Sequence, residues 1–220
     1  KELLRMKSEF LTVASHQLRT PMTAIRGYLS MAREAEVSAE EKREYLETAY
    51  SAANRMERII NDILTATELE AKEISLELKP TDLGKIVREV LSEMSVLVAQ
   101  KGLGIKFEEK VQFPQILSDP RRIREVLLNL VSNAVNYTEK GDVAVVLSQS
   151  DNYARCGIRD TGMGFTQGDA KRFTEKFYRT SEAISSQPNG SGLGLFITKT
   201  FVEALNGKLE WKSDGRGRGS

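Results

Sequence analysis

The sequence from Asp119 to Asn136 reads DPRRIREVLLNLVSNAVN and has the pattern of an amphipathic helix with a defined start. Asp119 can cap a helix by accepting a hydrogen bond from a free backbone N–H, and Pro120 suits the first helical position, where no N–H is needed. The apolar residues recur at helical spacing: Ile123, Val126, Leu127, Leu130 and Val131. The stretch therefore predicts a helix with one buried face.

Two asparagines, Asn129 and Asn133, lie four residues apart on this predicted helix. Side chains at that spacing project from the same side. An amide offers a carbonyl oxygen and N–H donors without adding charge, so the pair suits the binding of Mg²⁺ together with phosphate oxygens. The alternative is that both amides simply face water.

The segments on either side of this helix show both helix and strand patterns. Upstream, Asp82 can cap a helix that runs to about Gln100 and ends at Gly102, and residues 104–111 alternate as a strand. Downstream, we expect a hairpin of Val143–Ser148 and Tyr153–Arg159 turned at Asp151-Asn152, a helix over Leu193–Leu205 stopped at Asn206-Gly207, and a strand over Lys208–Ser213. This order predicts an α+β fold, an α/β sandwich with helices over a mostly antiparallel sheet.

Two glycine-rich runs interrupt these elements. Asp160-Thr161-Gly162-Met163-Gly164 follows a strand, and its glycines let the backbone approach a flat ligand while the carboxylate can accept the exocyclic amine of adenine. Gly190-Ser191-Gly192-Leu193-Gly194-Leu195 precedes a helix, whose free N–H groups can face a triphosphate. An ordinary turn explains the first run equally well, and the second lacks the preceding strand of a Rossmann site.

The first 72 residues have helical spacing almost throughout. Leucine or isoleucine recurs every seven residues at Leu4, Leu11, Leu18 and Ile25. Ser38 and Glu41 form a capping box that starts a second helix, with an apolar face made of Tyr45, Ala49, Ala52, Met56, Ile60 and Ile63. Two such helices have too little core to be stable alone, so we expect a homodimer in which two hairpins form a four-helix bundle.

His16 is the single histidine of the chain. It falls on a seven-residue row with Glu2, Glu9 and Thr23, so it should point outward. Thr20 and Pro21 lie about one turn away, and Pro21 removes one helical hydrogen bond. A neutral imidazole nitrogen beside ATP can attack the γ-phosphorus, although most exposed histidines have no such role.

The overall composition excludes several classes of protein. With 32 Lys and Arg against 31 Asp and Glu, the net charge of +1 gives no field that favours nucleic acid. One cysteine and one histidine exclude zinc chemistry and internal disulfides within one chain, which suggests a reducing, cytoplasmic setting. No stretch has the roughly 20 apolar residues of a membrane span, although a membrane anchor could precede Lys1.

Five stretches of the chain, in order, resemble the conserved boxes of sensor histidine kinases of two-component systems. Ser15-His16-Gln17-Leu18-Arg19-Thr20-Pro21 resembles the H box, and Asn129-x-x-x-Asn133-Ala134 the N box. The other three are similar to the G1 box (Asp160 to Gly164), the F box (Phe173 to Phe177) and the G2 box (Gly190 to Leu195). The match extends over essentially the whole chain.

This resemblance implies an ATP-dependent protein-histidine kinase with Mg²⁺, a response regulator receiver domain as partner, and no nucleic acid. It implies a dimerisation and phosphotransfer domain over residues 1–78, an ATP-binding domain over residues 79–220, and a hinge near Lys79-Pro80-Thr81. His16 would be the phosphoacceptor, with Gln17 beside it and Thr20 orienting water for dephosphorylation of the regulator. Asn133, with Asn129, would hold Mg²⁺ and phosphates, and Asp160 would bind the adenine amine. Residues 178–189 would form a mobile lid, and the remaining nucleotide-binding positions would be Asn136, Tyr137, Gly162, Gly164, Phe177, Gly190, Gly192, Leu193, Gly194 and Leu195.

Three positions depart from the family pattern. Gln17 stands where an acidic residue often follows the histidine, and it cannot take a proton at neutral pH. Asn136 stands where the N box usually has lysine, and Phe165-Thr166 replaces the usual Ile-Pro. Two alternatives to an active kinase therefore stay open: a weakly active scaffold or phosphatase that binds a regulator, and a clamp-type ATPase of the same fold.

Overall fold

The computed structural model describes residues 2–34, 36–71, 75–110, 115–150, 153–187 and 190–220, which fold as two compact units. The first unit comprises residues 1–71 and the second residues 72–220. The predicted division at residues 78 and 79 stays a prediction. Within the second unit, the backbone N–H of Glu77 donates to the Asp119 carboxylate at 3.0 Å.

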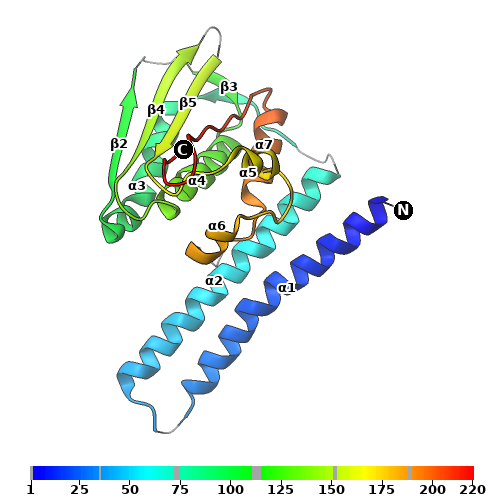
Figure 1. The fold of residues 1–220 in the computed structure, drawn as a ribbon, viewed down its shortest axis with the longest axis vertical. Helices are drawn as coiled ribbons and strands as arrows, with labels where there is room; N and C mark the ends of the chain where they lie inside the picture. Colours follow the sequence, from blue (N-terminus) through cyan, green and yellow to red (C-terminus); the bar gives the residue numbers. More distant parts are fainter. Residues whose placement is uncertain (1, 35, 72–74, 111–114, 151–152, 188–189) are drawn as a thin grey trace. The chain divides into compact units, whose positions relative to one another are not determined.

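The first unit is a hairpin of two long helices, α1 (Glu2–Met31) and α2 (Ala39–Glu70) (Figure 1). The predicted capping box is confirmed, because Glu41 N donates to Ser38 Oγ at 3.2 Å and Ser38 N donates to the Glu41 carboxylate at 3.0 Å. Mostly small or aliphatic side chains are buried in the hairpin: Ala14, Pro21, Ala32, Ala49, Ile59, Ala66 and Leu69. Ile59 is buried within the hairpin, whereas Ile60, on the apolar face predicted for α2, is 39% exposed in the single chain.

The second unit contains a three-stranded sheet in the order β2–β4–β5. β2 (Gly104–Glu109) runs parallel to β4 (Asp142–Ser150), and β5 (Tyr153–Asp160) runs antiparallel to β4. The parallel pair follows from the helix in the connection between β2 and β4, which returns the chain to the same end of the sheet. The strands predicted over residues 104–111, 143–148 and 153–159 are confirmed within the described residues, whereas Val111 and the turn at Asp151-Asn152 lie outside them.

Helices α3 (Leu83–Lys101) and α4 (Pro120–Asn136) pack on this sheet and form the core with it. The most deeply buried core residues are β-branched or leucine: Val87, Val90, Val131, Val135, Val143, Val145 and Leu147. Asp82 and Asp119 cap the two helices as predicted, and Gly102 ends α3 in the left-handed conformation with φ 64°.

One prediction for the second unit, the strand over residues 208–213, is wrong, while the hinge near Lys79-Pro80-Thr81 stays a prediction. Lys79–Thr81 forms β1, which pairs antiparallel with β3 (Ile116–Ser118), and Thr81 Oγ1 donates to Ser118 O at 3.1 Å. Residues 208–213 are described but form no strand. Instead Trp211 Nε1 donates to Ala170 O at 3.1 Å and its ring packs on Phe173, so side chains fix this segment.

Three shorter helices complete the unit: α5 (Gln167–Arg172), α6 (Ser181–Ser186) and α7 (Gly194–Ala204). Asn206, with φ 56°, follows the end of α7 where the sequence predicted a stop. None of the described helices combines the length and the apolar character that a membrane crossing requires.

Candidate functional site

Helix α4 brings Asn129 into contact with α7. Asn129 Nδ2 donates to Thr198 Oγ1 at 2.7 Å, and Thr198 is buried. A Cβ atom on Gly194 would lie 2.5 Å from Asn129 Oδ1, so only glycine fits at the start of α7 while this amide keeps its position. The structure therefore brings together the N-box and G2-box residues that are far apart in the sequence.

The F box and the G2 box meet through their backbones. Phe177 N donates to Gly192 O at 2.9 Å, and a Cβ on Gly192 would come within 2.7 Å of the Phe177 backbone. Both residues have positive φ, 62° for Phe177 and 73° for Gly192. A left-handed phenylalanine is uncommon and signals that its surroundings hold it there. Leu193, between these glycines and α7, is fully buried and anchors the loop.

The G1 loop lies at the carboxyl end of α4. Met163 N donates to Tyr137 O at 3.1 Å, and a Cβ on Gly162 would lie 2.3 Å from the same carbonyl oxygen. Gly162 N also donates to Asp160 Oδ1 at 2.9 Å. Gly164, with φ 59°, packs against the carbonyl of Gly215. The loop is thus held between the asparagine helix and the C-terminal segment.

Asp160, the predicted adenine-binding carboxylate, is half-buried at the end of β5. Its backbone exchanges two hydrogen bonds with Ser220, at 2.9 and 3.2 Å, and the Ser220 hydroxyl donates to Oδ2. Because each carboxylate oxygen has two lone pairs, Asp160 can accept a further hydrogen bond from an amine.

Lys101 places a positive charge at the carboxyl end of α4. Its Nζ donates to Val135 O at 2.7 Å and to Asn136 O at 3.0 Å, which satisfies two carbonyls that the helix leaves free. Burial lowers the pKa of Lys101, and the charge of Glu139 opposes that shift. Asn136 donates to Ser132 Oγ at 3.1 Å, so the position that departs from the family pattern is tied to its own helix.

The described part of the predicted lid, residues 178–187, folds around Arg179. The guanidinium donates to Gly190 O at 3.2 Å and also to the carbonyls of Ala183 and Gln187. Thr180 caps α6 by accepting from Ala183 N at 3.1 Å. Sequence reasoning did not single out Arg179, although it lies two residues after the F box. Residues 188 and 189 of the predicted lid lie outside the described residues.

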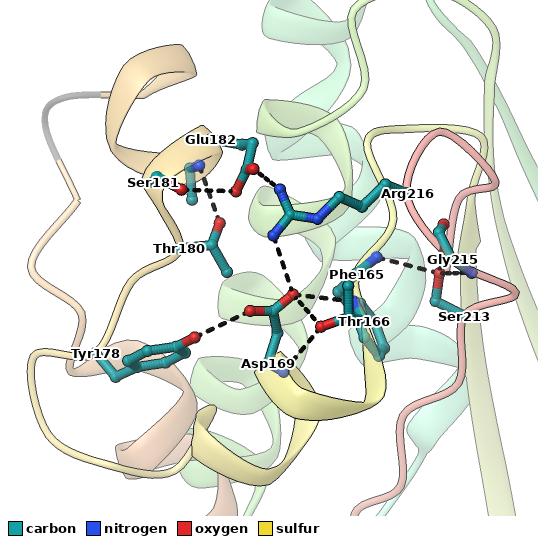
Figure 2. Close-up of polar contacts among 11 residues, drawn as sticks. Phe165, Thr166, Asp169, Tyr178, Thr180, Ser181, Glu182, Ser213, Gly215 and Arg216 are labelled. Atoms are coloured by element: carbon teal, nitrogen blue, oxygen red, sulfur yellow. Dashed lines mark hydrogen bonds and ion pairs between the residues drawn. The ribbon is translucent and has the colours of Figure 1, made fainter.

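A polar cluster around Asp169 joins Thr166, two residues after the G1 loop, to Tyr178 of the lid and to Arg216, and sequence reasoning missed it altogether (Figure 2). Asp169 is the N3 residue of a capping box with Thr166, a pattern visible in the sequence four residues after Phe165. Side-chain and backbone hydrogen bonds from Thr166 lower the pKa of Asp169, burial opposes them, and Tyr178 and Arg216 lower it further.

The predicted phosphoacceptor lies in the first unit. His16 is exposed on α1, as its polar row predicts, and Gln17 is half-buried beside it. Thr20 is exposed and its hydroxyl donates to His16 O at 3.4 Å. The candidate residues thus fall into two groups, the H-box residues in the first unit and the nucleotide-box residues in the second.

The donor set suits Mg²⁺ delivered with a nucleotide. Among the described residues, no three His, Cys, Asp or Glu side chains gather into a metal site. Mg²⁺ commonly takes one or two protein ligands and completes its shell with substrate phosphates and water. Asn133, half-buried four residues from Asn129 on α4, offers one neutral oxygen of that kind.

Comparison with known proteins agrees with this arrangement. Residues 6–72 match the His Kinase A (phospho-acceptor) domain, and residues 118–220 match the histidine kinase-, DNA gyrase B- and HSP90-like ATPase family. This chain belongs to the sensor histidine kinases. It is 34% identical over 219 residues to the signal transduction histidine-protein kinase BarA of Escherichia coli (strain K12), covering 97% of this chain and 24% of BarA. The sensor histidine kinase chain therefore spans about a quarter of the length of that relative.

Solved histidine kinase structures share the fold. Full-length ShkA in complex with AMPPNP is 31% identical, with a TM-score of 0.69 over 96% of this chain and 44% of ShkA. ThkA in complex with the response regulator protein TrrA is 20% identical, with a TM-score of 0.73 over 98% of this chain and 60% of that one. The predicted fold class and family are confirmed.

Proposed function

We propose that the chain transfers the γ-phosphoryl group of ATP to His16 and then to an aspartate of a response regulator. The observation that carries the proposal is the convergence of the nucleotide boxes in one unit, with Gly194 against Asn129, Gly192 against Phe177 and Gly162 against Tyr137. An exposed imidazole on α1 supplies the acceptor. The AMPPNP bound to ShkA supports ATP as the nucleotide.

Each group has a role in this transfer. Asp160 accepts the adenine amine, and the glycine backbone around Gly192 lies along the phosphates. Asn129 and Asn133 bind phosphate oxygens, with Asn133 as the protein ligand of Mg²⁺, which neutralises phosphate charge when bound. The unprotonated ring nitrogen of His16 forms the new P–N bond while the bond from the γ-phosphorus to the bridging oxygen breaks and ADP leaves, and the proton on the other ring nitrogen passes to water. The P–N bond then breaks as a regulator carboxylate forms a P–O bond.

The proposed homodimer is supported by uncovered apolar side chains on the first unit. On α1, Leu11, Met22 and Leu29 are 42–57% exposed, and on α2, Leu46, Tyr50, Ile60 and Leu64 are 39–70% exposed. Each set recurs along its helix at a spacing that places it on one stripe. A second copy that covers both stripes completes a four-helix bundle. The response regulator partner is supported by the complex of ThkA with TrrA.

Because His16 is the single histidine, a phosphohistidine test identifies the site directly. Purified chain incubated with [γ-³²P]ATP and Mg²⁺ should take up label that is stable in alkali and labile in acid. The variant His16→Gln should take up none, while Asn54→Gln, at an exposed position on α2, serves as a matched control with full labelling. Label retained on His16→Gln would refute the assignment.

Gln17 favours a second candidate, a chain whose main activity is dephosphorylation of its regulator. A glutamine cannot accept the imidazole proton, so autophosphorylation should be slow while water positioning by Thr20 is unaffected. Restoring a carboxylate with Gln17→Glu should raise the rate of label uptake, and Thr20→Ala should slow loss of phosphate from a phosphorylated regulator without changing label uptake. A clamp-type ATPase is disfavoured because residues 6–72 match the phosphoacceptor domain.

A further inference from the structure

Asp169 is a buried carboxylate that gathers donors from three separate segments. Thr166 donates from both its backbone N, at 3.0 Å, and its hydroxyl, at 2.7 Å. Tyr178 donates from its hydroxyl to Oδ1 at 3.0 Å, and Arg216 Nη2 lies 3.6 Å from Oδ2. Asp169 itself is only 9% exposed. A buried carboxylate needs these partners to compensate its charge, and losing any one of them costs free energy. The carboxylate of Asp169 therefore holds all of its partners in place.

Arg216 extends this cluster to the lid helix. One guanidinium nitrogen pairs with Asp169 and the other with Glu182, in the first turn of α6 (Figure 2). Arg216 is 48% and Glu182 43% exposed at the side chain. The loop that carries Arg216 is held in turn, because Phe165 N donates to Ser213 Oγ at 3.2 Å and Gly217 N to Met163 O at 2.6 Å. A continuous chain of contacts therefore runs from the G1 loop through Asp169 and Arg216 to α6.

The segments joined in this way are the G1 loop, the lid and the glycine-rich C-terminal segment. We propose that Asp169, Arg216 and Glu182 form a tether that holds α6 in place and thereby sets the rate at which nucleotide exchanges. Asp169 and Arg216 are positioning residues, since they act through the lid. The inference rests on the proposed binding of ATP by this unit.

The hydrogen bonds from Arg179 to the carbonyls of Ala183, Gln187 and Gly190 stabilise the internal fold of the lid. The tether is weaker than this set of hydrogen bonds. An ion pair that is nearly half exposed is worth about 0.4–1 kcal/mol, or about a two- to five-fold change in a rate. Such a contact breaks and reforms readily, which suits a lid that must open in every turnover.

The test compares Glu182→Gln, Arg216→Met and Arg216→Lys with the wild-type chain in two measurements. Hydrogen exchange of the peptide covering residues 180–187, without nucleotide, reports the tether itself. Release of a fluorescent ADP analogue, followed by stopped flow, reports its effect on exchange. Arg88→Met removes a similarly exposed ion pair with Glu109, between α3 and β2, and serves as the matched control.

We expect faster hydrogen exchange in residues 180–187 and about a two- to five-fold faster release for Glu182→Gln and Arg216→Met. Arg216→Lys should change both measurements less than Arg216→Met does. The double variant, Glu182→Gln with Arg216→Met, should release the ADP analogue no faster than Arg216→Met alone, because both changes remove the same contact. Arg88→Met should leave both measurements unchanged.

Two results would overturn the inference. One is a rate of hydrogen exchange in residues 180–187 of Glu182→Gln and Arg216→Met that is no faster than in Arg88→Met. The other is a double variant, Glu182→Gln with Arg216→Met, whose effect on release equals the sum of the two single effects. The failure of the wild-type chain to bind the ADP analogue would instead contradict the proposed function. Because the exchange experiment needs no nucleotide, it tests the tether in either case. Asp169→Asn tests the residue at the centre of the cluster. It should speed hydrogen exchange in residues 180–187 at least as much as Arg216→Met does, since it also weakens the hydrogen bond from Tyr178.

Discussion

Gly194 stands so close to Asn129 that a single methyl group between them would lie 2.5 Å from the amide oxygen. This contact is the point at which the helix carrying the asparagines meets the helix that follows the glycine loop. We expect the proposed nucleotide site to be sensitive to one added carbon atom, because Thr198 and Leu193 beside the contact are buried in a tightly packed interior.

The variant Gly194→Ala should therefore weaken ATP binding by about ten-fold or more, equivalent to about 1.4 kcal/mol, through displacement of Asn129. Calorimetric titration with AMPPNP measures the effect. Gly168→Ala is the control, since a Cβ there would meet its nearest neighbour, Thr166 Oγ1, at an ordinary 3.6 Å. Equal affinity for the two variants would contradict the proposed role of the contact.

Asp119→Asn should destabilise the second unit by about 1–3 kcal/mol at pH 7. Burial raises the pKa of this carboxyl, but hydrogen bonds from the backbones of Glu77, Arg122 and Arg121 outweigh burial, so the pKa lies below its ordinary value. The lowered pKa means that the stabilisation is present above the unfolded pKa of about 3.9 and is lost as pH falls through the folded value.

Urea unfolding at pH 7 and pH 3 tests this prediction. The difference in the free energy of unfolding between the wild type and Asp119→Asn should be smaller at pH 3. Asp82→Asn is the matched control, because Asp82 is exposed and its side chain accepts from Lys85 N at 2.9 Å. Asparagine caps a helix about as well as aspartate, so little change is expected there. A gap that stays constant with pH would count against the carboxylate as the cause.

Cys156 should be almost inert toward Ellman's reagent in the folded chain. It lies on β5 against the core, and burial raises the pKa of its thiol to about 12. Only about one molecule in ten thousand then carries the reactive thiolate at pH 8. Absorbance at 412 nm should rise slowly for native protein and rapidly in guanidinium chloride; rapid reaction of the native chain would show that the thiol is open to solvent.

Leu64→Asp should shift the chain from dimer to monomer. Leu64 is 56% exposed on the apolar stripe of α2, and a carboxylate inside a bundle would be buried without a partner. Sedimentation velocity at several concentrations measures the shift. Ser51→Asp, at an exposed position on α2 that does not lie on the stripe, is the control and should remain dimeric. A wild-type chain that sediments as a monomer at every concentration would argue against the proposed bundle.

Most of the fold could be predicted because its signals are local. The capping box at Ser38, the caps at Asp82 and Asp119, and the left-handed Gly102 each act within a few residues of the helix ends that they define. The short strands β1 and β3 were missed because three residues carry too little periodicity, and their pairing joins positions about 37 residues apart. The strand expected over residues 208–213 failed because Trp211 packs on α5 instead.

The candidate site could be predicted from the sequence only where the type of residue itself indicates a function, as with the asparagines, the glycines and His16. Arg179, Asp169 and Arg216 carry no such mark, since arginine and aspartate are common surface residues. Their importance comes from long-range contacts, such as that between Asp169 and Arg216, which no local spacing reveals.

The bond from Glu77 N to Asp119 ties the backbone at Glu77 to the start of α4. Helix α4 is a rigid rod of 17 residues, about 25 Å long, with Asp119 at one end and the asparagine amides toward the other. We therefore expect a force that reaches Glu77 along the backbone to act on the start of this rod and to shift the asparagines that we propose to bind phosphate.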